Sequence, residues 1–184
     1  MRAFREIIIT LILAVAIFFS LHFTVQSFIV VGSSMEPTFH NGQRILINKI
    51  AYNFQEPERG DVLVFHPPNN QQADYIKRII AMPGDTVEIK EETVYVNGTQ
   101  LDEPYIKAPP RYTFHHDEIP ENSYFVLGDN RNNSNDSHND WLVPRQNIIG
   151  KAWLSIWPPN EWGLAANYPL AEQLASTELL PQLP

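Results

Sequence analysis

At residues 31–38 the chain reads Val-Gly-Ser-Ser-Met-Glu-Pro-Thr, directly after a long apolar segment. From Ile7 to about Val25 that segment consists mainly of Ile, Leu, Ala, Val and Phe, and it has no formal charge. A helix of this length would measure about 28 Å, close to the ~30 Å hydrocarbon core of a bilayer. The segment therefore predicts a transmembrane helix, and residues 31–38 lie just beyond its exit from the membrane.

The residues in front of the apolar segment indicate its orientation. Arg2 and Arg5 precede it, and positive charge favours the cytoplasmic side of a membrane. We therefore expect a cytoplasmic N-terminus and an extracytoplasmic domain after Val25. The alternative is a cleaved signal peptide, whose apolar core of about 7–15 residues would be followed by a small-x-small site. The only such triplet near the core, Ala14-Val15-Ala16, lies inside the apolar run, which favours an uncleaved anchor.

Beyond the anchor, short apolar segments alternate with turn signals. Fifteen prolines are costly inside helices and central strands, and no helix-length amphipathic segment is evident after residue 30. The pattern predicts a mainly β fold, an antiparallel and barrel-like sheet domain at 26–160, after an anchor at 1–25 and before a loosely ordered tail at 161–184. The expected strands are Gln26–Val31, Arg44–Lys49, Val62–Phe65, Tyr75–Ala81, Thr86–Lys90, Thr93–Val96, Ser123–Leu127 and Ile148–Trp157.

Composition excludes several classes of site and partner. The chain has no cysteine, so it can form neither disulfides nor thiolate metal sites. A net charge of -8 argues against a nucleic-acid partner. No metal-ligand constellation, phosphate loop or nucleotide fingerprint is evident, and we expect neither a metal nor another cofactor.

Ser34 is a candidate nucleophile, and it would need a base to take its proton. Lys77 could serve if it were neutral, although only roughly one lysine in 2,500 is neutral at pH 7. Burial lowers the pKa of a lysine, and a pKa of about 8 would make roughly one in ten neutral. On the predicted strand, Tyr75 and Ile79 lie on the same face as Lys77 and supply apolar surroundings. The alternatives are a solvated lysine at a strand edge or one of six histidines as base.

Three stretches, in order, resemble the signature boxes of the bacterial type I signal peptidases. They are Gly32–Thr38, Tyr75–Asp85 and Gly128–Ser137, and the single anchor is similar to the short, single-span members of that family. The resemblance implies a membrane-anchored serine endopeptidase with a Ser-Lys dyad. Its partners would be secretory preproteins and the lipid bilayer of a plasma or thylakoid membrane. It would remove signal peptides by cutting after small residues at positions -3 and -1.

The resemblance also implies a role for particular residues. Ser34 would be the acylating nucleophile, and its backbone N–H would be an oxyanion donor. Lys77 would be the general base, oriented by a hydrogen bond from Ser134, and Asp136 would brace the site. Pockets for small substrate side chains would be lined by Phe28, Val30, Asp74, Tyr75 and Ile76, with Met35 as a wall beside the nucleophile.

Two positions depart from the family pattern. Some members have a serine where this chain has Gly32, and its hydroxyl is a second oxyanion donor. Loss of such a donor can cost about 10²–10³ in rate, so we expect another group to replace it. The third box continues into His138, where an arginine is common, which leaves the partner of Asp136 open.

Two other functions remain as alternatives. A self-cleaving repressor shares the Ser-Lys chemistry but would need a DNA-binding segment, and this chain is acidic with an apolar N-terminus. A non-catalytic, anchored β-domain would keep the strands, but it would have no use for Ser34, Lys77 and the Ser134–Asp136 loop together. Substitution of Ser34 separates a binding module from a peptidase.

Overall fold

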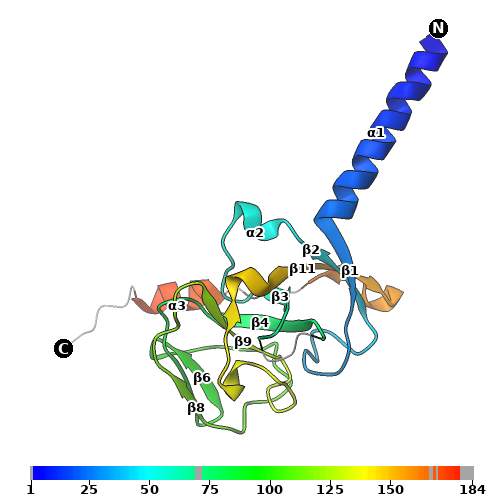
Figure 1. Cartoon of the computed structure of the whole chain (residues 1–184). Coiled ribbons are helices and arrows are strands. Elements are labelled where there is room, and N and C mark those ends of the chain that lie inside the picture. The colour runs from blue at the N-terminus through cyan, green and yellow to red at the C-terminus, as the bar shows by residue number, and fades with distance from the viewer. Residues whose placement is uncertain (1, 69–71, 166–167, 169, 179–184) are drawn as a thin grey trace.

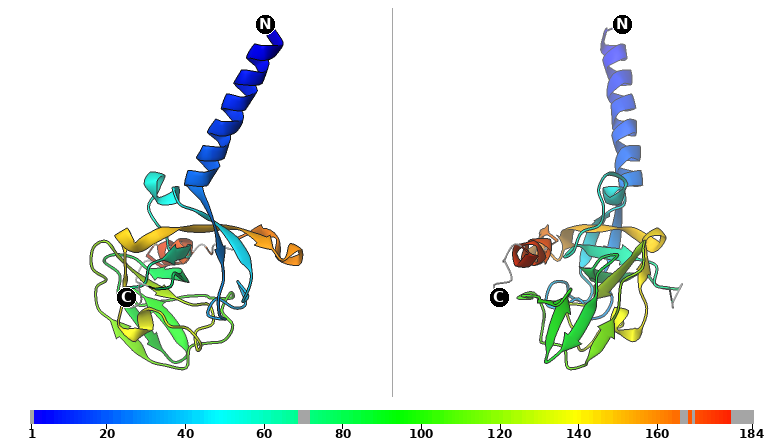
Figure 2. Two further views of the ribbon diagram at one scale, coloured as in Figure 1. Left: turned by 45° about the vertical axis from the view of Figure 1, so that its right-hand side comes forward. Right: turned by 90° about the vertical axis from the view of Figure 1, so that its left-hand side faces the viewer.

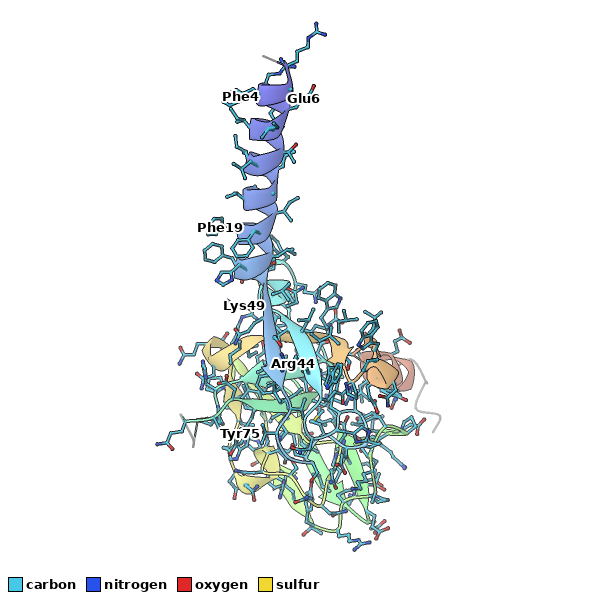
Figure 3. The ribbon with its side chains drawn as sticks, turned by 90° about the vertical axis from the view of Figure 1, so that its right-hand side faces the viewer. Phe4, Glu6, Phe19, Arg44, Lys49 and Tyr75 are labelled. Atoms are coloured by element: carbon cyan, nitrogen blue, oxygen red, sulfur yellow. The ribbon has the colours of Figure 1, made fainter. Side chains whose placement is uncertain are left out.

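A single long helix projects from a β-rich domain (Figure 1). The computed structural model describes residues 2–68, 72–165, 168 and 170–178. The helix, α1 (Arg2–Thr24), buries no residue against the domain. Within the described ranges it alone is long and apolar enough to cross a membrane, judged by length and composition. Phe4 and Phe19 stand clear of the domain (Figure 3), as expected for side chains that face lipid.

The domain contains two antiparallel sheets (Figure 2). The larger sheet follows the order β1-β2-β11-β3-β4-β9-β10, with β12 added on β11. Its strands are β1 (Val25–Ile29), β2 (Arg44–Asn48), β3 (Val62–Phe65), β4 (Tyr75–Ala81), β9 (Ser123–Leu127), β10 (Val143–Pro144), β11 (Ile148–Trp157) and β12 (Gly163–Leu164). The smaller sheet has the order β7-β6-β5-β8, formed by β5 (Val87–Lys90), β6 (Thr93–Val96), β7 (Thr99–Gln100) and β8 (Phe114–His116). This confirms the mainly antiparallel β fold behind an apolar helix.

Burial along the strands shows where the core lies. All four residues of β3 are buried, and so are six of the seven in β4, because these central strands are covered on both faces. β5 and β6 instead bury every second residue, the pattern of strands with one face toward a core. The core therefore extends from the middle of the larger sheet to the inner face of the smaller one.

Two strand edges are left open where the larger sheet is interrupted. Among the described strands, β1 ends the sheet and pairs only with β2. The pairing of β4 with β9 begins at Arg78, so Tyr75–Lys77 pairs with β3 on one side only. Unpaired edges carry free backbone N–H and C=O groups that can accept another strand.

The C-terminal region corrects one expectation. We predicted a loosely ordered tail from residue 161, but the structure has β12 and then α3 (Leu170–Glu178). Leu170 and Leu174 are buried in the core cluster that includes the smaller sheet. The pattern was missed because, among the helix side chains that the structure describes, these two apolar residues one turn apart mark the buried face. A second short helix, α2 (Ala51–Phe54), was also not expected, and residues 179–184 lie outside the described ranges.

Candidate active site

Ser34 lies in a turn that is tied to the rest of the domain by its backbone. Its carbonyl accepts a hydrogen bond from the Asn130 N–H at 3.0 Å. The Asn130 side chain also donates to the carbonyl of Ser33, at 3.0 Å. Within the turn, the Phe39 N–H donates to the carbonyl of Met35 at 2.9 Å, and both side chains are buried. The turn therefore holds Ser34 in place on both sides.

Lys77 comes from β4 and reaches Ser34 directly. Its Nζ lies 2.8 Å from the Ser34 Oγ and 2.9 Å from the Ile76 carbonyl oxygen. The ring of Tyr75 lies 5.3 Å from the same nitrogen, and Lys77 is only 4% exposed. A hydroxyl within hydrogen-bond distance of an enclosed amine is the arrangement expected for a nucleophile and its base.

The surroundings of Lys77 favour its neutral form. Burial lowers the pKa of the Lys77 ammonium from 10.5 to about 8, whereas the carboxylates of Asp136 and Asp129 act in the opposite direction. At that pKa roughly one molecule in ten has a neutral amine at pH 7. The amine can therefore accept a proton near neutral pH, which an exposed lysine cannot do to any useful extent.

Asp136 is buried and has three hydrogen-bond donors. The Gly128 N–H donates to Oδ2 at 2.9 Å. On the other oxygen, Oδ1 lies 2.6 Å from the His138 Nδ1 and 3.3 Å from the His138 N–H. The His138 ring in turn stacks on Tyr112, with 4.3 Å between centroids. The imidazole thus provides the partner of Asp136 that the sequence left open.

Ser134 lies near Ser34, but its contact differs from the expected one. Within the described part of the chain, its buried hydroxyl has no hydrogen-bond partner, so it does not bond to Lys77. A Cβ at Gly128 would lie 2.4 Å from the Ser134 Oγ and 2.4 Å from the Ser34 carbonyl oxygen. The absence of a side chain at Gly128 therefore lets the two serine segments approach each other.

A buried ion pair lies behind the nucleophile, and the sequence patterns did not predict it. Arg78 donates to both oxygens of Asp129, at 2.9 and 2.8 Å, and neither side chain is exposed. The Thr38 hydroxyl, in the same turn as Ser34, also donates to Asp129. A charged pair with this many hydrogen bonds fixes the position of the turn relative to β4.

A cleft of about 470 Å³ opens between the free edges of β1 and β4. Figure 3 shows Tyr75 on this domain beneath α1. The cleft contains Ser34 and Lys77 and four of the predicted pocket residues, Phe28, Asp74, Tyr75 and Ile76, together with Ile29, Val31, Ala73 and Asn135, which were not predicted.

Two predicted pocket residues lie elsewhere. Val30 and Met35 are 2% and 0% exposed and belong to a core cluster rather than to the cleft lining. The sequence could not say which side chains near residue 30 would be covered by the core. Val31, 83% exposed, and Ile29, 49% exposed, face the cleft instead.

Two further predictions concern donors and metals. Within the described residues the Ser34 N–H has no hydrogen-bond acceptor, whereas the Gly32 N–H donates to the Asn41 Oδ1 at 2.8 Å. The same part of the chain holds no group of three or more His, Asp or Glu side chains that could bind a metal ion. Independence of a metal remains a prediction.

Comparison with known proteins gives a consistent result. A family described as signal peptidase, peptidase S26, matches residues 3–157. Probable signal peptidase I-2 of Synechocystis sp. is 45% identical and covers 77% of this chain and 67% of its own. Probable signal peptidase I-1 of the same organism is 40% identical and covers 88% and 85%. A signal peptidase I from Enterococcus faecalis is 33% identical, covers 53% and 97%, and has a TM-score of 0.49. The chain belongs to the S26 family of signal peptidases.

Proposed function

We propose that this peptidase is anchored in a membrane and removes N-terminal signal peptides from secretory preproteins. The observation that carries the proposal is the 2.8 Å distance between the Lys77 Nζ and the Ser34 Oγ, inside a cleft with mainly apolar walls. The relatives named signal peptidase I support the substrate class. The apolar helix α1 supports the anchor.

The reaction would proceed through an acyl-enzyme. Neutral Lys77 takes the Ser34 proton as the Oγ attacks the scissile carbonyl carbon, and the carbonyl oxygen becomes an oxyanion that the Ser34 N–H stabilises. The lysine ammonium then gives its proton to the departing amine, and the C–N bond breaks. Lys77 next takes a proton from water, whose oxygen attacks the ester. As the ester breaks, the proton passes to the Ser34 Oγ, which restores both groups.

The substrate would bind as an added strand. Main-chain groups on the free edges of β1 and of Tyr75–Lys77 can pair with an extended peptide between them. Phe28, Ile76 and their apolar neighbours line the cleft, and they would contact the substrate side chains at positions -3 and -1, which we expect to be small. Asp74 and Tyr75 would contact the same peptide.

The membrane topology is part of the proposal. Arg2 and Arg5 at the start of α1 support a cytoplasmic N-terminus, and the catalytic domain from residue 26 would then be extracytoplasmic. The membrane would be a plasma or thylakoid membrane, where preproteins emerge from translocation with their signal peptides still inserted.

The test is cleavage of a preprotein in liposomes by the intact chain, Ser34→Ala and Lys77→Ala. We expect the intact chain to cut after a small residue and both variants to be inactive while folded. Lys90→Ala is a control, because Lys90 lies on the smaller sheet, outside the cleft.

The outcomes test the role of each residue and then the function itself. Full activity in Lys77→Ala would show that the base is misassigned, and a histidine would have to be sought. Full activity in folded Ser34→Ala would show that another residue is the nucleophile. If the intact chain cuts no preprotein at all, the proposed function is wrong and an anchored binding domain takes its place.

A further inference from the structure

The chain from residue 158 onward lies beyond the part that matches the family, yet its described residues up to the end of α3 are docked on the domain. Leu170 and Leu174 are buried with the inner face of the smaller sheet. Gln173 fastens the helix through two hydrogen bonds with the backbone of Asp102: its Oε1 accepts from the N–H at 2.9 Å, and its Nε2 donates to the carbonyl at 3.0 Å. This segment is therefore an integral part of the fold.

Tyr168, just before α3, lies against the buried ion pair. Its ring centroid is 4.6 Å from that of Tyr105. The Arg78 Cζ lies 4.3 Å from the Tyr105 ring centroid and 5.7 Å from that of Tyr168. The Tyr168 backbone passes so close to Gly60 that a Cβ on Gly60 would lie 1.7 Å from the Tyr168 carbonyl oxygen. The Gly60 carbonyl, in turn, accepts a hydrogen bond from the Arg78 Nη1 at 2.8 Å. The segment thus reaches the guanidinium through the Tyr168 ring, and its backbone lies against Gly60, which bonds to Arg78.

The ion pair leads from Tyr168 to the nucleophile. Arg78 holds Asp129 at two oxygens, and Asp129 accepts the hydroxyl of Thr38 in the Ser34 turn. A cavity of about 270 Å³ has Thr38 and Tyr168 among its lining residues. The cavity lies between the Ser34 turn and the C-terminal segment. The contacts that connect the two therefore run through the buried ion pair.

We propose that Tyr168 is a positioning residue for the catalytic turn. Its ring excludes water from Arg78, and an ion pair without competing water holds its geometry more firmly. Asp129 then keeps Thr38, and with it Ser34, at the correct distance from Lys77. The inference rests on the proposed function only for its activity readout. Motion of the turn can be measured whether or not the protein cuts preproteins.

The experiment compares Tyr168→Ala, Tyr168→Phe and Leu174→Ala in the full chain in detergent. Thermal unfolding reports stability, hydrogen exchange reports the backbone amides of residues 33–39, and preprotein cleavage gives kcat and KM. We expect Tyr168→Ala to raise the exchange rate of these amides about tenfold and to lower kcat about tenfold. Its KM should stay within about twofold of the value for the intact chain. Tyr168→Phe keeps the ring and should match the intact chain. Leu174→Ala should lower the unfolding temperature but change neither the exchange of the turn nor kcat.

Each result bears on the proposal. Unchanged exchange and kcat in folded Tyr168→Ala would overturn it. Equal changes in folded Leu174→Ala would also overturn it, because the segment would then act through general stability. If the intact chain cuts no preprotein, the proposed peptidase function fails, and the exchange rates alone still decide the role of Tyr168.

Discussion

At the scale of single residues, the burial of Lys77 has two measurable consequences. The first concerns the pH dependence of cleavage. Because burial lowers the pKa of Lys77 to about 8 and only the neutral amine can take a proton, kcat/KM should rise about tenfold per pH unit below pH 8 and level off above it. Cleavage of a peptide substrate between pH 5 and 10 measures this. A profile that is flat across pH 6–9 would exclude Lys77 as the titrating base.

The second consequence concerns stability. A lysine whose pKa is lower in the folded than in the unfolded state weakens folding whenever it is protonated. The resulting loss of stability is complete below pH 8 and decreases as the pH rises from 8 toward 10.5. Replacing Lys77 by methionine should therefore stabilise the protein at pH 7 by up to about 3 kcal/mol while abolishing activity.

Urea unfolding of the domain at pH 7 and pH 10 measures this difference. The advantage of Lys77→Met over the intact chain should shrink at the higher pH, since the lysine of the folded state is then largely neutral. An equal advantage at the two pH values would mean that packing, rather than charge, causes the effect.

At the scale of elements, the loop after β9 depends on Gly128. A Cβ at this position would meet the Ser34 carbonyl oxygen at 2.4 Å, and a backbone atom cannot move aside as a flexible side chain can. Gly128→Ala should therefore displace Ser34 from Lys77 and lower kcat/KM by about 10²-fold. Gly163→Ala in β12 is the matched control, because a Cβ there meets nothing within 4 Å. Activity of folded Gly128→Ala equal to that of the control would contradict this account.

The strands were predictable from sequence because apolar runs end at turn residues. Val62–Phe65, Tyr75–Ala81 and Ile148–Trp157 have the predicted bounds. The helix α3 was missed, since Leu170 and Leu174 become a buried face only when the smaller sheet covers them. Local patterns report a periodicity, whereas tertiary packing determines whether a short helix is stable.

Part of the candidate site was also predictable from the sequence. Motifs identified Ser34 and Lys77, and the structure brings these two side chains together. The contact of Arg78 with Asp129 joins two separate motifs, and that of Asp136 with His138 depends on the direction of the imidazole ring; neither follows from the order of residues. Val30 and Met35 were placed in the cleft because a motif gives the order of residues along the chain, but not the direction in which each side chain points.

At the scale of the whole molecule, the helix and the catalytic domain are joined without a linker. Thr24 ends α1 and Val25 begins β1, and the Lys49 N–H donates to the Thr24 carbonyl at 2.9 Å. Insertion of six Gly/Ser residues between Thr24 and Val25 should leave cleavage of a short soluble peptide unchanged. Processing of a preprotein in liposomes should become slower and less uniform in its cut position.

Mass spectrometry of the released protein measures the cut position. If the insertion variant cleaves the peptide and the preprotein as the intact chain does, the direct connection is dispensable. Slower cleavage of the soluble peptide would show instead that the insertion damages the domain itself.

The direct connection between α1 and β1 would fix the distance of Ser34 from the membrane. Ser34 follows the last residue of α1 by ten residues, of which the first five form β1, a strand of about 17 Å. With α1 in a bilayer as proposed, Ser34 would therefore stay at a set height above the membrane surface, whatever substrate arrives. Among several small residues in a substrate, the one at this height would be cut. The length of a substrate's own membrane-embedded segment would then select its cleavage site as much as the side chains around it.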